Sequence, residues 1–244
     1  PVLDNIAQVA AQEFRFQAYD PITDEHLEWS VPIEIKQNWV SVDPGTHQVG
    51  LQVNSEDVKS LIENWQNSLG DSRSFETIPE TDSIIEKWED GSPVMVTIHH
   101  APTTYTVSAG ESLWAVSLKL GMPMWHIMDA NEGLTADNIS AGMVLTIPSK
   151  NILLPLPVVP EKRIVIDIGD QTMTVYENGQ VRNHYIVSTG MSNSPTMAGI
   201  FQIQSHEINA YASNWDLWMP HFMGIYEAWP GFMHGIHGLP LLSG

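Results

Sequence analysis

YTVSAGESL, residues 105–113, is the stretch that decides the fold of the middle of this chain. Residues 105–107 have the apolar and β-favouring composition of a short strand, and Gly110 permits the turn that follows. Ser112 is a helix N-cap residue type, and it precedes apolar residues at helical spacing. Those residues are Leu113, Val116 and Leu120. The stretch therefore predicts a strand, a turn and an amphipathic helix.

The same pattern continues beyond this helix. Gly121 is expected to end it, and Pro123 is expected to begin a second helix that carries Trp125, Ile127 and Met128. Gly142 then permits a turn into a last strand at residues 144–147. The segment is therefore predicted to be a β-α-α-β unit whose two strands pair antiparallel.

Residues 104–149 closely resemble a LysM domain over its full length, through residues 105–113, 125–131 and 140–148. The resemblance implies binding of N-acetylglucosamine chains, as found in peptidoglycan or chitin. It places the glycan-binding groove in two loops, which consist of Gly110, Glu111 and Ser112, and of Asn131, Glu132, Gly133 and Leu134. For Asn131 a structural role, in which its amide satisfies local backbone groups, is the alternative.

A proline-rich linker, residues 150–160, separates this unit from the last segment, residues 161–244. Short strands are predicted there at residues 163–168, 172–177 and 181–188, with Asn178-Gly179 as a hairpin turn. Regular short strands with turns between them predict a mainly-β domain.

The last segment resembles the L,D-transpeptidase catalytic domain of the YkuD type. The matching pieces, in order, are residues 164–167, 171–177, 187–190, 195–203, 219–220 and 236–238. Met197 stands where the family usually has proline. In the family the nucleophilic cysteine follows in a Ser-His-Gly-Cys motif, whereas this chain has no cysteine and only a few residues after His237. We therefore expect the domain to be truncated at its C-terminus.

The resemblance implies a transferase of cell wall biogenesis. In the family, a cysteine thiolate attacks the amide carbonyl at the third residue of a stem peptide, releases the terminal D-alanine and leaves a thioester. An amine from a second stem then resolves the thioester, which gives 3-3 cross-linking or wall attachment. The resemblance assigns His237 as the catalytic base, with substrate contacts from Met219, Tyr226 and Gly238. It requires neither cofactor nor metal. Without the cysteine, the chain as it stands is expected to be inactive.

Two alternatives concern residues near this motif. Met219, His221, Phe222, Tyr226 and Trp229 lie where the family covers its substrate, and ordinary core or edge packing is the alternative for them. A metal site is another interpretation of His234 and His237, with His221 as the third ligand. We discount that reading because glycines surround these histidines and no helix is predicted to hold them.

The first segment, residues 1–103, mixes both kinds of secondary structure. Helices are predicted at residues 5–14 and 55–69, the latter with Ser55 as N-cap, and from Thr81. Strands are predicted at residues 14–19 (with Tyr19 facing outward), 49–53 and 94–98. This α+β segment has a weaker resemblance to the peptidoglycan-binding-like domains that precede some L,D-transpeptidases. A spacer is the alternative.

The chain is strongly acidic, with 29 Asp or Glu against 10 Lys or Arg and a net charge of −19. This charge argues against nucleic acid and anionic membrane surfaces as partners. Calcium binding is a weaker alternative, since no EF-hand spacing is present. No run of residues is apolar enough to span a membrane. We expect peptidoglycan as the partner and the bacterial cell envelope, or the extracellular cell wall, as the location.

Two functions compete at this stage. The first is a cell-wall L,D-transpeptidase with a LysM targeting module and a nucleophile outside these residues. The second is a non-catalytic peptidoglycan-binding or surface-assembly protein, which the absence of cysteine favours. An incomplete domain would also expose strand edges, and these favour self-association.

Overall fold

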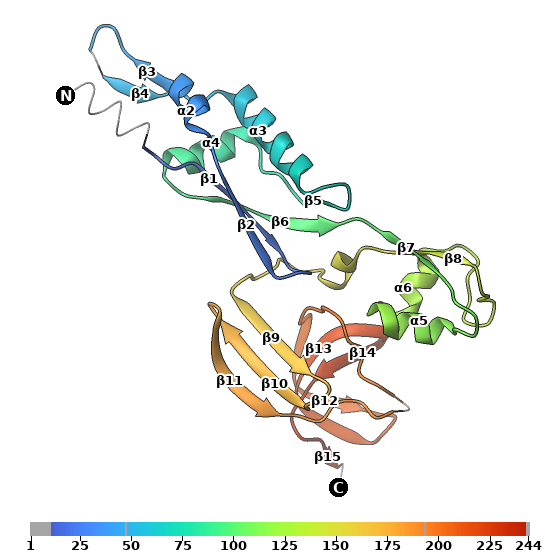
Figure 1. Ribbon diagram of the computed structural model, residues 1–244. Coiled ribbons are helices and arrows are strands. Elements are labelled where there is room, and N and C mark those ends of the chain that lie inside the picture. Colours follow the sequence, from blue (N-terminus) through green and yellow to red (C-terminus); the bar gives the residue numbers. More distant parts are fainter. Residues whose placement is uncertain (1–10, 47, 193, 243–244) are drawn as a thin grey trace. The chain divides into compact units, whose positions relative to one another are not determined.

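A computed structural model describes residues 11–46, 48–192 and 194–242. The chain divides into two compact units, residues 1–101 and 102–244, and Figure 1 shows the elements of each. The helix predicted at residues 5–14 falls mostly outside the described residues. No helix among the described residues is long and apolar enough to cross a membrane.

The first unit is built on a four-stranded sheet with the order β2-β1-β6-β5. Its strands are β1 (Arg15–Asp20), β2 (Glu25–Ser30), β5 (Arg73–Phe75) and β6 (Val94–His100). β1 pairs antiparallel with β2 and parallel with β6, so that Phe16 lies opposite both Trp29 and Val94. A small hairpin of β3 (Val40–Val42) and β4 (Val49–Leu51) lies apart from this sheet.

The described part of the unit also contains the helices α2 (Ile33–Trp39), α3 (Ser55–Ser68) and α4 (Thr81–Glu89) (Figure 1). The apolar residues of α3 are buried against the sheet, together with Trp39, Trp88 and the inward residues of β1 and β6. Those of α3 are Val58, Leu61, Ile62 and Trp65. The N-cap of α3 is Asn54, not the predicted Ser55: its side chain accepts hydrogen bonds from the N–H groups of Glu56 and Asp57. The predicted strand 49–53 ends at Leu51 for the same reason, because the chain must turn into this cap.

The outer face of β1 differs from the prediction at its end. Tyr19 was expected to face solvent, but it is buried because it packs on the His26 ring and donates a hydrogen bond to Asp24. Asp20 is fully buried beside His100 and Arg73. Burial raises the pKa of Asp20, but the hydrogen bond from His100 and those from two backbone N–H groups outweigh it and lower the pKa overall.

The second unit begins with the predicted β-α-α-β arrangement. It comprises β7 (Thr103–Thr106), α5 (Leu113–Leu120), α6 (Met124–Asp129) and β8 (Val144–Ile147), and β7 pairs antiparallel with β8. Ser112 caps α5 by accepting from the Ala115 N–H, and Gly121 ends it in a left-handed conformation, as predicted. The short 3-10 helix η1 (Lys150–Leu153) follows.

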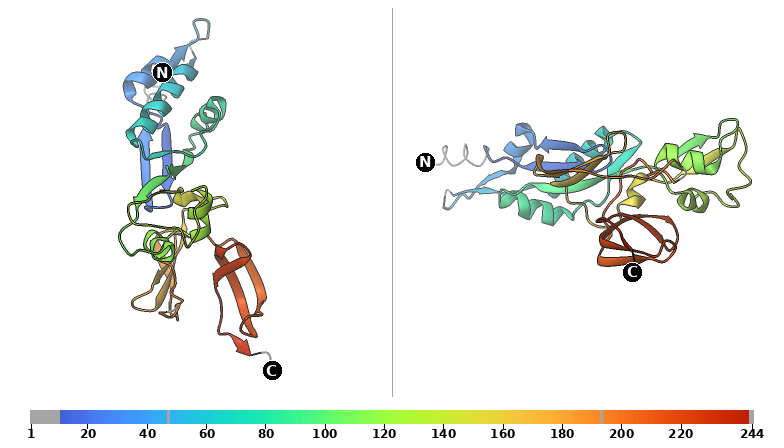
Figure 2. Two further views of the ribbon diagram at one scale, coloured as in Figure 1. Left: turned by 90° about the vertical axis from the view of Figure 1, so that its right-hand side faces the viewer. Right: turned by 90° about the horizontal axis from the view of Figure 1, so that it is seen from below.

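The described residues of the range 161–242 contain only strands as regular structure (Figures 1 and 2). β9 (Lys162–Asp167), β10 (Thr172–Glu177) and β11 (Gln180–Ile186) form one sheet, and the turn between β10 and β11 has positive φ at both Asn178 and Gly179, as predicted for a hairpin. β12 (Ser205–Ala212), β13 (Leu217–Trp229), β14 (Phe232–Ile236) and β15 (Leu241–Leu242) form a second sheet around the long β13.

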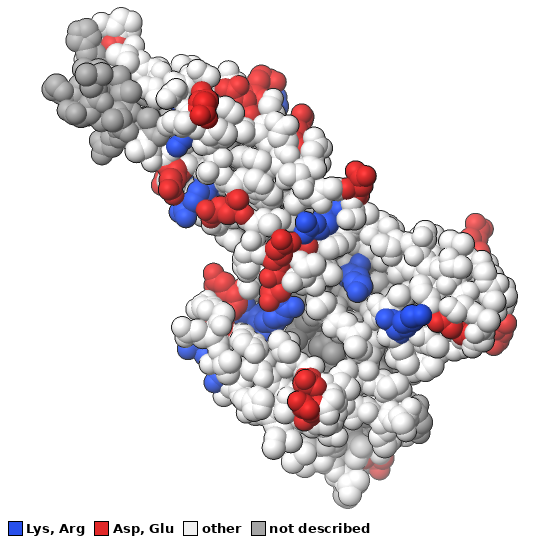
Figure 3. All heavy atoms as spheres, in the orientation of Figure 1, with Lys and Arg blue, Asp and Glu red and all other residues white. Residues whose placement is uncertain are grey.

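Acidic residues outnumber basic ones by 29 to 10. On the face shown in Figure 3 they are spread over several elements and are not gathered into one patch. The excess is greatest in residues 1–104, with 18 Asp or Glu against 5 Lys or Arg. This distribution gives a well-solvated surface.

Candidate functional site

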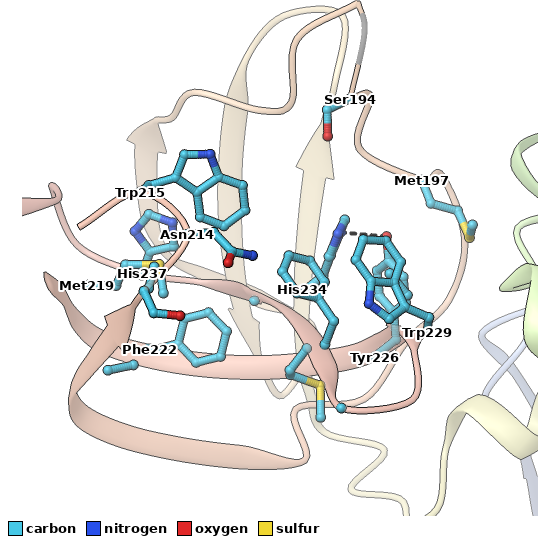
Figure 4. A pocket seen from close by; sticks show the side chains of 18 of the residues that line it. Ser194, Met197, Asn214, Trp215, Met219, Phe222, Tyr226, Trp229, His234 and His237 are labelled. Atoms are coloured by element: carbon cyan, nitrogen blue, oxygen red, sulfur yellow. Dashed lines mark hydrogen bonds between the residues drawn. The ribbon is translucent and has the colours of Figure 1, made fainter. Parts of the chain in front are cut away.

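The second unit contains a cavity of about 670 Å³ over the sheet of β12, β13 and β14. Figure 4 shows side chains from these strands, from the turn that holds Asn214 and Trp215, and from the loop that holds Ser194 and Met197. Aromatic and methionine side chains make up much of the lining. Such a surface, with a few polar groups in it, is typical of a small-ligand or peptide site.

The cavity brings together most of the residues that the sequence placed near the substrate. These are His237, Met219, Phe222, Tyr226 and Trp229. Gly238 and His221 are not among its lining residues. Sequence reasoning missed Trp114, Trp215 and Phe232, which also line it. Trp114 belongs to α5, so no local pattern in residues 161–244 could have identified it.

His237 has a defined orientation at the end of β14. Its Nδ1 lies 2.8 Å from the Gly238 carbonyl oxygen, and its ring stacks near-parallel to Phe222 with centroids 6.2 Å apart. A carbonyl oxygen can only accept, so Nδ1 carries the proton in this bond. In the neutral ring, Nε2 then holds a free lone pair, which is the form that a general base needs. Gly238 is itself fixed because its N–H donates to the Pro220 carbonyl at 2.7 Å.

Tyr226 and His234 form an uncharged pair in the cavity wall. A hydrogen bond of 2.8 Å joins the Tyr226 hydroxyl and His234 Nδ1, and Phe201 stacks on Tyr226 with centroids 4.4 Å apart. Burial raises the pKa of Tyr226 to about 12 and lowers the pKa of His234. Both side chains are therefore neutral near pH 7, and Nδ1 of His234 is already engaged.

In the part of the chain that the structure describes, no three His, Asp or Glu side chains are grouped closely enough to hold a metal ion. Of the two histidines from the discounted metal reading, His234 contacts Tyr226 and Phe232, and His237 contacts Phe222 and Gly238.

The first loop predicted to bind glycan follows β7, and the second follows α6 ahead of β8. Gly110, Ser112, Glu132 and Gly133 are exposed, whereas Glu111, Asn131 and Leu134 are half-buried. Leu134 packs against the apolar core of this part of the unit. The exposed members are the ones free to contact a ligand.

The Asn131 side chain links α6 to β8. Its Nδ2 donates to the carbonyls of Ile127 and Thr146, each at 2.7 Å, and its Oδ1 accepts from the Thr146 N–H at 2.8 Å. This is the structural role that the sequence left open as the alternative. Contact between Asn131 and glycan stays a prediction.

Two family models match the second unit, one over its β-α-α-β segment and one over its mainly-β segment. Residues 105–148 match the LysM domain, and residues 161–241 match the L,D-transpeptidase catalytic domain. The chain carries a LysM domain and an L,D-transpeptidase-type domain. The LysM fold and the mainly-β fold expected for the two domains are those that the structure shows.

A curated relative and two solved structures show similarity to this chain. A protein of Bacillus licheniformis named as the L,D-transpeptidase YkuD is 26% identical over 105 residues, which are 43% of this chain and 61% of that relative. A cysteine-to-serine mutant of Enterococcus faecium L,D-transpeptidase aligns over 96% of this chain and 81% of its own, at 16% identity and a TM-score of 0.37. The Ldtfm–avibactam carbamoyl enzyme aligns over 96% and 79%, at 15% identity and a TM-score of 0.36.

The Asn131→Ala substitution is expected to destabilise the LysM domain by about 2 kcal/mol, because it leaves the Thr146 N–H and two carbonyls without their partner. Hydrogen exchange of the amides in residues 103–148 measures this. Glu132→Ala, at an exposed position of the same loop, serves as the control and should leave exchange unchanged. Equal exchange in the two variants would contradict the linking role.

Glu111 predicts an acid-sensitive LysM domain. The Ser108 N–H, the Tyr105 hydroxyl and Lys119 all donate to its carboxylate, and together they lower its pKa to about 2. Since the folded pKa lies below the ordinary value, this carboxylate stabilises the fold above about pH 4.5 and ceases to do so as the pH falls toward 2. The free energy of unfolding of this domain, measured with urea, should fall as the pH is lowered over that range. The fall should be smaller in Glu111→Gln. If the free energy of unfolding fell equally with pH in both proteins, Glu111 would not be the cause of the acid sensitivity.

Proposed function

We propose that this chain is a cell-wall protein of the L,D-transpeptidase type that binds peptidoglycan. The LysM domain holds the glycan, and the cavity over β12, β13 and β14 holds a stem peptide. The location proposed is the bacterial cell envelope. The observation that carries the proposal is His237, which lies in the cavity of a matched catalytic domain with its Nε2 lone pair free.

His237 is the proposed general base. An acyl transfer to a thiol nucleophile needs a group that removes the thiol proton, and a neutral imidazole with an unprotonated ring nitrogen suits this task. The carbonyl of Gly238 fixes the ring by accepting from Nδ1, so Gly238 positions the base. Met219 and Tyr226 are the proposed peptide contacts in the same cavity.

The 244 residues contain no cysteine, so the proposal gives them binding and proton uptake, not the bond-forming nucleophile. The expected truncation of the domain and the expected self-association stay predictions. The resemblance of the first unit to peptidoglycan-binding-like domains likewise stays a prediction.

Co-sedimentation with purified peptidoglycan tests the binding function. The 244-residue chain should pellet with the sacculi, and chitotetraose should compete. His237→Ala is a matched control that should pellet equally, since its ring is assigned to proton transfer. If the chain stayed in the supernatant, the proposed peptidoglycan binding would be contradicted.

A non-catalytic peptidoglycan-binding or surface-assembly protein is the second candidate, favoured by the absence of cysteine. Intact mass and peptide mapping of the native protein separate the two. A cysteine-containing peptide beyond these residues would support the transpeptidase. A mass near 27.2 kDa, together with binding, would select the second candidate.

A further inference from the structure

The LysM domain supplies one wall of the cavity that holds His237. Trp114 and Leu118 of α5, and Met124 at the start of α6, line the same space as Met219 and His237. Trp114 is 43% exposed although its side chain is large and apolar. A glycan-binding domain joined to the rest of the chain only by a linker would not need to contribute side chains to the peptide site.

Specific contacts hold this wall in place. The indole Nε1 of Trp125 donates to the Glu227 carbonyl of β13 at 2.9 Å. Phe201 of the transpeptidase-type domain packs against the LysM core and stacks on Tyr226. Gly121 lies so close to Ala198 that an added Cβ would come within 2.5 Å of its carbonyl oxygen. These contacts join LysM to the strand that forms the cavity floor.

The glycan loop leads directly into the wall. Trp114 stands two positions after Ser112, the last residue of the first predicted glycan loop. Two residues span at most about 7 Å between their Cα atoms. A sugar in contact with Ser112 would therefore lie near Trp114, whose partly exposed side chain lines the cavity.

We propose that LysM and the cavity bind a single ligand, a glycan disaccharide that still carries its stem peptide, and that Trp114 contacts the sugar–peptide junction. This inference rests on the proposed function and specifies its substrate class. An indole suits a junction of this kind because it offers an apolar face to sugar or peptide and a polar edge to water. Linking the two parts in one molecule makes the second contact intramolecular, so the joined ligand binds about 10²-fold more tightly than either part.

Calorimetric titration of the 244-residue chain tests this with three probes: chitotetraose, a free stem tetrapeptide and a disaccharide–tetrapeptide. The disaccharide–tetrapeptide should bind about 10²-fold more tightly than either other probe. Trp114→Ala should remove most of that advantage. Trp125→Phe keeps an aromatic ring but loses the hydrogen bond to Glu227, so it should reduce the advantage while affinities for the two free probes stay unchanged.

The outcomes separate the two proposals. If both free probes bind and the joined probe binds no more tightly than the better of them, the single-ligand inference is overturned and the proposed function stands. If none of the probes binds, the proposed function itself fails. An advantage that survives intact in both Trp114→Ala and Trp125→Phe also overturns the inference, because the wall would then play no part in it.

Discussion

Replacing Trp88 by alanine should lower the free energy of unfolding of the first unit by about 3–5 kcal/mol. Trp88 is fully buried, and its ring lies against Phe14 and Trp39 with centroids 5.6 and 6.2 Å away. Its Nε1 also donates to the Arg15 carbonyl at 3.0 Å, which ties α4 to the start of β1. The substitution removes this packing, leaves a cavity and leaves that carbonyl without its donor.

Urea denaturation followed by circular dichroism would measure the loss. Met95→Ala, on the exposed face of β6, is the control and should stay within about 0.5 kcal/mol of the parent. Trp88→Phe retains an aromatic ring, so it should lie between the two. A Trp88→Ala protein as stable as Met95→Ala would show that this core does not hold the unit together.

Replacing Gly121 by valine should be the most damaging single change in the LysM domain. Gly121 has φ of +62°, and its added Cβ would meet the Ala198 carbonyl oxygen at 2.5 Å. The left-handed conformation costs a non-glycine residue about 1–2 kcal/mol, and the forced displacement of residues 198–199 adds roughly 1–3 kcal/mol.

Comparison with Gly133→Val isolates the cost of displacing residues 198–199. Gly133 has a similar φ of +75°, but nothing lies within 4 Å of its added Cβ. It should therefore show only the backbone cost. Hydrogen exchange at residues 198–201 should rise in Gly121→Val and not in Gly133→Val. Matching losses of stability in the two variants would mean that the contact with Ala198 carries no energy.

Local signals explain what the sequence could predict. Ser112, Gly121 and the Asn178-Gly179 turn act within a few residues of themselves, and each is found where its residue type predicts. Where two candidates compete, the pattern is ambiguous: Asn54 and Ser55 are both good caps, and only the hydrogen bonds of Asn54 distinguish them. The burial of Tyr19 depends on His26 and Asp24 across a turn, which periodicity along one strand does not contain.

Some residues of the candidate site could likewise be predicted from the sequence, and others could not. His237 and Met219 could be predicted because matched family motifs carry them, and Tyr226 because it lies where the family covers its substrate. Trp114 lies on another domain and Trp215 in a turn, and each reaches the cavity only through tertiary packing. The free Nε2 of His237 likewise depends on a backbone carbonyl, which every residue possesses and no motif marks.

The strand order of the first unit bears on how the protein emerges from the ribosome. β1 lies between β2, which follows it at once, and β6, which is made only after three helices. A lone two-stranded hairpin is marginal in water, so β1 and β2 cannot persist before β6 joins them. Closing so long a loop makes that step slow. During synthesis, the apolar faces of α3 and α4 therefore stay exposed until residue 100 has left the exit tunnel, and this interval is when the nascent chain most needs a chaperone.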